Sequence, residues 1–278
     1  MDADHVAGAV SSGAADLAFD GPLYAANTAY HRSFDHTVLA DLPLRPGAAV
    51  LDIGCGAGDL TARVAELVGA GTPSGGTVLG IDASASQITY ARATYGRPGL
   101  EFRVCRAQDL GTVVARDSLD AVLSVAVLHW VPRTEQPAVL SGVAHCLRPG
   151  GVLRADFGGA GQAEATRVVI EPISRSFGGP VSPWYFPEAP EYAALVERAG
   201  LSVRRARLVT QRRPFPEAPS FEGWLRSTFV LGYLPGIAAE RRAEFTETAI
   251  GAALEALRNR DGSYDQEFVR VDVLAARP

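Results

Sequence analysis

The chain has 278 residues, 47% of them hydrophobic and 21% charged, which is typical of a folded globular protein with one large or two small domains. Its formal net charge of −5 argues against a nucleic-acid-binding surface, which would carry a basic excess. No apolar run is long enough to span a bilayer, the N terminus lacks the features of a signal peptide, and the three scattered cysteines form neither a disulfide framework nor a metal-binding spacing. We therefore expect a cytoplasmic protein that binds no metal, no nucleic acid and no membrane.

The first predicted element is a helix near the N terminus. Apolar residues recur at helical spacing between about residues 23 and 42, and Pro43 ends the pattern. The segment carries three side chains that could close over a ligand: Tyr24, Tyr30 and His31. We predict that residues 1–45 form a helical lid, or alternatively that they contact a second copy of the chain. The sequence leaves the oligomeric state open.

A strand, a glycine-rich turn and a helix follow. The apolar run 48–53 has Asp52 near its end, glycines stand at the alternate positions 54, 56 and 58, and a helical pattern begins at Leu60. Glycine lets the backbone turn with positive φ and approach a ligand, and the amides at the start of the helix would point toward that ligand. A dinucleotide-binding fingerprint would place its third glycine at position 59, where this chain has aspartate. A phosphate-binding loop is also disfavoured, because no lysine follows the glycines.

Strands and helices then alternate along most of the chain. The strands predicted after residues 48–53 are 77–81, 100–106, 119–125, 152–157, 201–209 and 268–275. The predicted helices are 60–68, a helix capped by Ser84 or Ser86 that runs to Tyr95, 136–146, 163–177, 192–199 and 238–259. Apolar strands that alternate with helices are typical of a parallel sheet covered on both faces, so the predicted fold class is a doubly wound α/β sheet.

Polar residues follow several of these strands, at the edge where such a sheet binds its ligands. Asp82 ends the second strand, Gln108 and Asp109 follow the third, and His129 lies beyond the fourth. A carboxylate at position 82 could accept both hydroxyls of a ribose, and Asp109 could accept from an exocyclic amine such as that of adenine. Each aspartate also has a simpler alternative role, because aspartate is common at helix caps and in turns.

Five segments together resemble the ordered motifs of the class I S-adenosylmethionine (SAM)-dependent methyltransferases: 52–58, 80–84, 107–110, 119–122 and 147–151. Three others are most similar to the trans-aconitate methyltransferase-like branch of that family: 128–131, 184–187 and 223–226. The resemblance implies a Rossmann-like sheet of seven strands whose last strand is antiparallel, with SAM as methyl donor and S-adenosylhomocysteine as product. We accordingly divide the rest of the chain into a SAM-binding core at 46–210, an acceptor-side cap insertion rich in helix and aromatic residues at 211–262, and a final strand at 263–278.

The resemblance also assigns roles to residues at the sheet edge. The glycine turn would contact the methionine end of SAM, Asp82 would hold the ribose, and Gln108 with Asp109 would hold the adenine. Residues just after Ser124 would line the methyl group. The residues that we predict to bind the cofactor are Tyr24, Tyr30, Asp52, Gly54, Cys55, Gly56, Asp82, Ala83, Gln87, Gln108, Asp109, Leu110 and Ser124.

The acceptor side is less sharply defined. His129 is the candidate for a general base or for a contact with the acceptor. Aromatic residues beyond the fifth strand could line the acceptor pocket, and arginines could hold an acceptor carboxylate through two parallel hydrogen bonds. The residues that we predict to bind the substrate are Trp184, Tyr185, Phe186, Arg212, Trp224 and Arg226.

These observations predict a methyltransferase that acts on a small molecule by O- or C-methylation, with secondary metabolites among the candidate acceptors. A carboxylate acceptor predicts arginine in the pocket, an alcohol or phenol predicts an essential His129, and an alkene or indole predicts mainly aromatic walls. Two other classes stay open. One is a SAM- or nucleotide-binding module without catalysis; the other is an NAD(P)-dependent oxidoreductase, which Asp59 in place of the third glycine disfavours.

Overall fold

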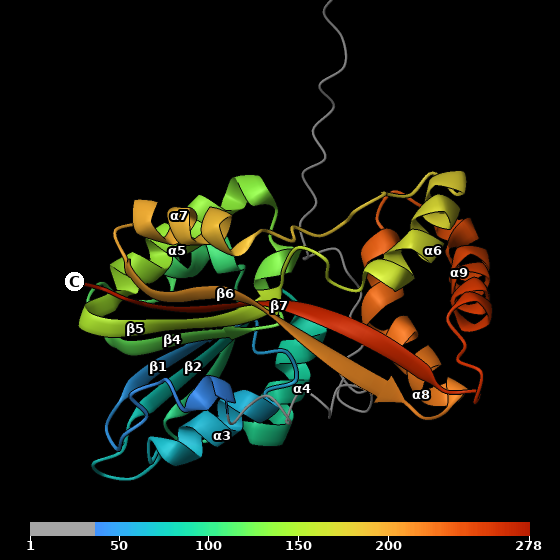
Figure 1. Cartoon of the computed structure of the whole chain (residues 1–278). Coiled ribbons are helices and arrows are strands. Elements are labelled where there is room, and N and C mark those ends of the chain that lie inside the picture. The colour runs from blue at the N-terminus through green and yellow to red at the C-terminus, as the bar shows by residue number, and fades with distance from the viewer. Residues whose placement is uncertain (1–36) are drawn as a thin grey trace, which may run out of the picture.

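The computed structural model describes residues 37–278, which fold around a sheet of seven strands (Figure 1). The spatial order of the strands is β3-β2-β1-β4-β5-β7-β6. β1 to β5 pair in parallel, and β7 runs antiparallel to both of its neighbours, so the predicted Rossmann-like sheet with an antiparallel last strand is confirmed. The strands are β1 (Ala49–Ile53), β2 (Thr77–Asp82), β3 (Leu100–Val104), β4 (Leu119–Val125), β5 (Leu147–Gly158), β6 (Ser202–Phe215) and β7 (Tyr264–Ala276).

Helices cover both faces of the sheet, which explains why its central strands are apolar on both sides. Leu51 of β1 packs in a cluster with residues of α5 and α7, whereas its neighbour Val50 packs with α3 and α4. Successive strand residues point to opposite faces, so one apolar run supplies both clusters. Figure 1 shows α5 and α7 on one face and α3 on the other. The helices are α3 (Asp59–Leu67), α4 (Ala85–Tyr95), α5 (Gln136–Cys146), α6 (Glu164–Ser176), α7 (Ala189–Arg198), α8 (Ala218–Trp224) and α9 (Arg242–Ala256).

Shorter helical turns connect these elements. They are η3 (Ala107–Thr112), η4 (Leu128–Trp130), η5 (Arg133–Glu135), η6 (Leu225–Phe229), η7 (Val230–Tyr233) and η8 (Ala239–Arg241), of which η6 is a π-helical turn. Two of them, η3 and η4, follow β3 and β4 and therefore lie at the edge of the sheet where ligands bind.

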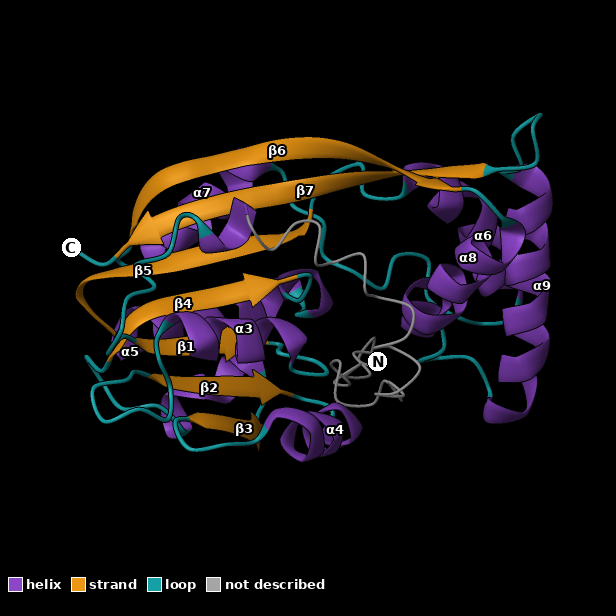
Figure 2. Cartoon of the chain, turned by 90° about the horizontal axis from the view of Figure 1, so that it is seen from below, coloured by secondary structure: helices purple, strands orange, loops and turns teal. Residues whose placement is uncertain are grey.

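β6 and β7 are longer than the sequence predicted. The predicted strands ended at residue 209 and began at residue 268, whereas β6 continues to Phe215 and β7 begins at Tyr264. β5 pairs with β7 only from Arg270 onward, so the earlier part of β7 pairs with β6 alone. The two strands therefore leave the sheet as a two-stranded ribbon, with α6, α8 and α9 gathered at its far end (Figure 2). We call this group of helices the cap.

The cap is built from two separate parts of the chain. The predicted cap insertion covered residues 211–262, and the prediction placed the helix 163–177 in the core. In the structure that helix, α6, instead packs against α9 inside the cap. The cap has an apolar core of its own, which includes Phe215, Phe221 and Phe245. A helix that precedes the insertion in the chain thus supplies part of its core, which sequence pattern alone does not show.

A buried ion network joins β5, β6 and β7 to the segment before β1. Arg154 of β5 is only 1% exposed; its Nε lies 3.1 Å from Asp41 and its Nη1 lies 2.9 Å from Asp272 of β7. Arg205 of β6 pairs with the same two carboxylates. The hydrogen bond from Arg205 lowers the pKa of Asp41 below its ordinary value, so this carboxylate contributes stability above that value and loses its contribution as the pH falls through the lowered pKa.

Across residues 37–278, no helix has the length and apolar character needed to cross a bilayer. Over the same range, no group of three or more His, Cys, Asp or Glu side chains is placed to hold a metal ion. Cys55, Cys105 and Cys146 are buried and separate from one another.

Candidate active site

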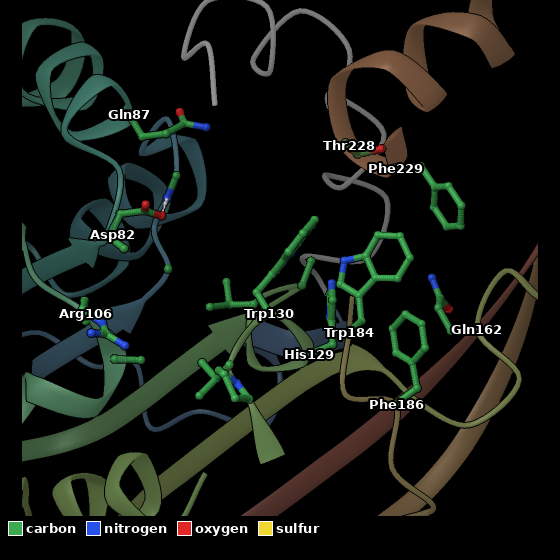
Figure 3. Close-up of a pocket in the computed structure, with 18 of the residues that line it drawn as sticks. Asp82, Gln87, Arg106, His129, Trp130, Gln162, Trp184, Phe186, Thr228 and Phe229 are labelled. Carbon is green, nitrogen blue, oxygen red and sulfur yellow. Dashed lines mark hydrogen bonds between the residues drawn. The ribbon is translucent and has the colours of Figure 1, made fainter. Parts of the chain in front are cut away.

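A cavity lies at the carboxyl ends of the parallel strands, between the sheet and the cap (Figure 3). Its two ends differ in chemistry. The polar end, beside β1, β2 and β3, is lined by Gly54, Gly56, Asp82, Ala83, Gln87, Arg106 and Gln108. The aromatic end, beneath the cap, is lined by Trp130, Trp184, Phe186, Trp224, Phe229 and Phe268, with Gln162, Thr228 and Arg270 among them.

The glycine turn after β1 forms part of the polar end. Gly54 has a φ of 73°, and a Cβ at this position would lie 2.1 Å from the side chain of Val127, so only glycine fits. The amides of Gly54 and Cys55 donate to the carbonyl oxygen of Ile81 at 2.7 and 3.0 Å. The amide of Gly56 donates to Asp82 at 3.0 Å. These three amides are therefore already engaged, and the turn does not present them to a ligand phosphate as a phosphate-binding loop would.

Asp82 ends β2 with its carboxylate at the cavity. Its Oδ2 accepts from the amide of Gly56 at 3.0 Å and its Oδ1 accepts from the amide of Ser84 at 2.8 Å. Burial raises the pKa of Asp82 above its ordinary value, and the two backbone hydrogen bonds act in the opposite direction. A carboxylate has about four acceptor positions, so each oxygen keeps capacity for one more donor. The site suits a ligand with two neighbouring hydroxyls.

Two glutamines complete the polar end. Gln87 lies in the first turn of α4, whose cap is Ser84, and it is only 3% exposed. Its Oε1 has no hydrogen-bond partner in the described part of the chain. Leaving a buried acceptor unpaired costs about 1–3 kcal/mol, so this oxygen indicates a donor group on the ligand. Gln108 donates to Glu135, which also pairs with Arg106 at 3.0 Å.

Two of the predicted cofactor residues, Tyr24 and Tyr30, lie outside the described residues, as does His31. Five others are described but are not among the lining residues: Asp52, Cys55, Asp109, Leu110 and Ser124. Asp52 and Ser124 are buried within strands and use their side chains in hydrogen bonds to the protein, at 2.7 and 3.1 Å. Cys55 and Leu110 pack in the apolar clusters, and Asp109 is exposed. Side chains of neighbouring residues in a strand or tight turn point in different directions. A residue next to a lining residue in the sequence therefore need not line the cavity itself.

His129 lies between the two ends of the cavity. Its Nδ1 accepts a hydrogen bond from the amide of Gly158 at 3.1 Å, so the neutral imidazole carries its proton on Nε2. The ring contacts those of Trp130 and Phe186, with centroid distances of 5.6 and 5.7 Å. Of the two roles predicted for His129, this geometry favours a hydrogen-bond donor that contacts the acceptor over a general base.

The predicted substrate residues fall into two groups. Trp184, Phe186 and Trp224 line the aromatic end. Tyr185, Arg212 and Arg226 are not among the lining residues; each forms a hydrogen bond or ion pair with a carboxylate, at 2.9, 2.7 and 2.7 Å respectively. The prediction of arginines that hold an acceptor carboxylate is therefore not matched by the positions of Arg212 and Arg226. Arg212 is exposed on β6, where it pairs with Asp265 of β7, and Arg226 of η6 pairs with Glu222 of α8 and Glu247 of α9.

Several lining residues were missed by sequence reasoning: Arg106, Trp130, Gln162, Thr228, Phe268 and Arg270. For two of them an indication was available. Phe268 and Arg270 stand two residues apart on a predicted strand, so their side chains must lie on the same face of the sheet. Arg270 is paired with Asp156 of β5, Nε to Oδ1 at 2.7 Å. Gln162 and Thr228 gave no local signal, because the packing of the cap decides where they point.

The order of the sheet with its antiparallel last strand, the glycine turn and the acid at the end of the next strand define a fold of the methyltransferase class. Residues 50–151 match the methyltransferase domain family. Trans-aconitate 2-methyltransferase from Deinococcus radiodurans is 30% identical over 249 residues, which cover 85% of this chain and 90% of that protein. The chain belongs to the class I SAM-dependent methyltransferases, and SAM is its methyl donor.

Two solved structures share the fold at low sequence identity. The geranyl diphosphate C-methyltransferase from Streptomyces coelicolor A3(2), in complex with Mg2+, geranyl diphosphate and S-adenosylhomocysteine, has a TM-score of 0.54 and 17% identity, and the match covers 93% of this chain and 84% of that one. The cyclase SpnF has a TM-score of 0.56 and 17% identity, and the match covers 88% and 80%. One is named a methyltransferase and the other a cyclase, so the fold alone defines neither the acceptor nor the reaction.

Proposed function

We propose that this methyltransferase acts on a small-molecule acceptor by O- or C-methylation, with the donor at the polar end and the acceptor at the aromatic end. The observation that supports this most directly is that one cavity joins Asp82 and Gln87 to the aromatic rings beneath the cap (Figure 3). When bound, SAM supplies a methyl group activated by its sulfonium. The remaining steps depend on how the side chains of this chain position and shield the two ligands.

The polar end fits an adenosine derivative without phosphate. Asp82 would accept hydrogen bonds from the two ribose hydroxyls. Gln87 would accept a further hydrogen bond through its unpartnered Oε1, and Gln108 would contact the adenine. The engaged amides of the glycine turn suit a ligand without phosphate, and the same feature counts against the NAD(P)-dependent alternative.

The aromatic end fits an acceptor with an apolar body. Methyl transfer is an in-line displacement, so the protein contributes chiefly alignment and the exclusion of water, and alignment can be worth ~7 kcal/mol or more. The rings provide rigid apolar walls, and the Nε2–H of His129 would hold a polar atom of the acceptor near the boundary between the two ends.

Two measurements test the proposal. Calorimetric titration with S-adenosylhomocysteine should show one site per chain, and a panel of small molecules incubated with radiolabelled SAM should yield a methylated product identified by mass. Saturable S-adenosylhomocysteine binding without transfer to any small molecule, but with transfer to a protein or nucleic acid, would contradict the proposed acceptor class.

Replacing His129 by alanine should lower the rate of methyl transfer about tenfold, the scale of one lost hydrogen bond to the acceptor, and leave the affinity for S-adenosylhomocysteine unchanged. The His129→Gln variant, which keeps an N–H donor, should recover part of the rate. If His129→Gln is as slow as His129→Ala, the donor role is lost and the general-base role is restored.

A further inference from the structure

Gln162 is a buried amide that points into the aromatic end of the cavity. It lies in the loop between β5 and α6, is 8% exposed, and lines the cavity. Its Oε1 has no hydrogen-bond partner in residues 37–278. Figure 3 shows its amide facing the rings of Trp184, Phe186 and Phe229. Apolar rings cannot satisfy an amide oxygen, and leaving it unpaired costs about 1–3 kcal/mol.

The surroundings fix this side chain in place. The backbone amide of Gln162 donates to the backbone carbonyl of Gly159 at 2.9 Å. The backbone carbonyl of Gln162 accepts from Nε of Arg167 at 3.1 Å. A Cβ on Gly158 would lie 3.1 Å from Cγ of Gln162 and 2.6 Å from Phe186, so a glycine there makes room for both. The backbone of Gln162 is therefore held on both sides, which leaves the side-chain amide directed into the cavity.

The charges along the cavity disfavour an ionic acceptor. The two arginines that line the cavity in the described part of the chain, Arg106 and Arg270, are both paired with carboxylates, at 3.0 and 2.6 Å. A carboxylate on the acceptor would therefore have to compete for them, and it would repel Oε1 of Gln162. A cationic acceptor would find no carboxylate at this end, because the one acidic residue among the described lining residues is Asp82, at the polar end.

We propose that Gln162 determines acceptor specificity by hydrogen-bonding a neutral hydroxyl on an acceptor whose remaining body is apolar. A hydroxyl can donate to Oε1 and accept from Nε2 of the same amide, which neither a carboxylate nor an ammonium group can do. This inference rests on the proposed function, because it assumes that the aromatic end holds the acceptor. It sets this chain apart from its trans-aconitate 2-methyltransferase relatives, whose named acceptor is a polycarboxylate.

The chain offers a direct probe of this end of the cavity. All three of its tryptophans line it: Trp130, Trp184 and Trp224. Intrinsic tryptophan fluorescence therefore reports occupancy without turnover. Suitable ligands are 1-adamantanol, 1-adamantanecarboxylate and 1-adamantanamine, which share one rigid, non-fluorescent apolar body and differ only in the polar group. Trans-aconitate is the fourth ligand.

With S-adenosylhomocysteine bound, 1-adamantanol should bind about tenfold more tightly than the carboxylate or the amine, the scale of one buried hydrogen bond. The Gln162→Leu variant should lose most of that preference and keep its affinity for S-adenosylhomocysteine. Gln211→Leu makes the same chemical change on half-exposed β6, at a position that pairs with the lining residue Phe268 but does not itself line the cavity, and should behave as the unaltered protein.

Two results would overturn the inference: a preference for the alcohol that survives in Gln162→Leu, or tighter binding of trans-aconitate or the adamantane carboxylate than of the alcohol. The donor titration separates this failure from failure of the proposed function. If S-adenosylhomocysteine binds with one site per chain but the alcohol preference is absent, only the role of Gln162 is lost.

Discussion

The Asp272→Ala variant should lose about 3–5 kcal/mol in its free energy of unfolding, the range observed when one partner of a buried ion pair is removed. Asp272 is 4% exposed and faces Arg154, which is 1% exposed. Oδ1 of Asp272 lies 2.9 Å from Nη1 of Arg154, and its Oδ2 lies 2.9 Å from Nε of Arg205. Without this carboxylate, Arg154 keeps its charge in a buried site with Asp41 as its remaining acidic partner.

Urea denaturation followed by circular dichroism would measure the loss. Glu101→Ala is the matched control, because it removes a carboxylate from the exposed pair with Arg103, whose distance is 2.7 Å. Surface pairs contribute about 0–1 kcal/mol, so this control should lose little stability. Asp272→Asn keeps the shape of the residue and one oxygen acceptor, so its loss of stability should lie between those of Asp272→Ala and Glu101→Ala. If Asp272→Ala loses no more than Glu101→Ala, the buried network does not stabilise the fold.

The sequence predicted the central sheet well because the physical signals there are local. β1, β2 and β4 are covered on both faces, so they appear as continuous apolar runs, and glycines that require positive φ follow β1. The ends of β6 and β7 were missed for the opposite reason. The ribbon beyond the sheet has polar residues such as Asp265 and Glu267 between its buried ones, and its stability comes from pairing with a distant strand.

The functional site likewise contains residues that local sequence patterns predict and residues whose place depends on distant parts of the chain. Asp82 and Gln108 were predicted because a residue that directly follows a parallel strand must lie at the ligand-binding edge. The prediction placed Arg212 and Arg226 in the acceptor pocket, which they do not line, because the charge of a residue does not show which way its side chain points. Arg212 pairs with Asp265, 53 residues away in the sequence, and Arg226 pairs with Glu247, 21 residues away, as well as with Glu222 one helical turn earlier. Gln162 was missed because its importance depends on a missing partner, which only the packed structure reveals.

The Asp82→Ala variant should bind S-adenosylhomocysteine about 30-fold more weakly, which corresponds to roughly 2 kcal/mol for the loss of charged hydrogen bonds to the ribose. Alanine also releases the amides of Gly56 and Ser84, so Asp82→Asn is the sharper variant. It keeps the shape of the residue and one side-chain oxygen, which can still accept from one of these two amides; it removes the charge and replaces the other acceptor by an NH2 donor.

The dependence of this affinity on pH provides a second measurement. Burial raises the pKa of Asp82 above the ordinary value of 3.8, and the ionised carboxylate is the form that accepts hydroxyls. Affinity for S-adenosylhomocysteine should therefore fall as the pH decreases toward the raised pKa and level off above it. Asp82→Asn cannot ionise at this position, so its affinity should lack this component of the pH dependence.

Asp109→Ala is the matched control for both measurements, because Asp109 is exposed and is not a lining residue, although the sequence predicted that it would hold the adenine. Its affinity and pH dependence should match those of the unaltered protein. A loss in Asp109→Ala as large as that in Asp82→Ala would move the adenine toward η3 and restore the sequence-based assignment. Unchanged affinity in both Asp82 variants would remove Asp82 from the ribose, and with it the placement of the donor at the polar end.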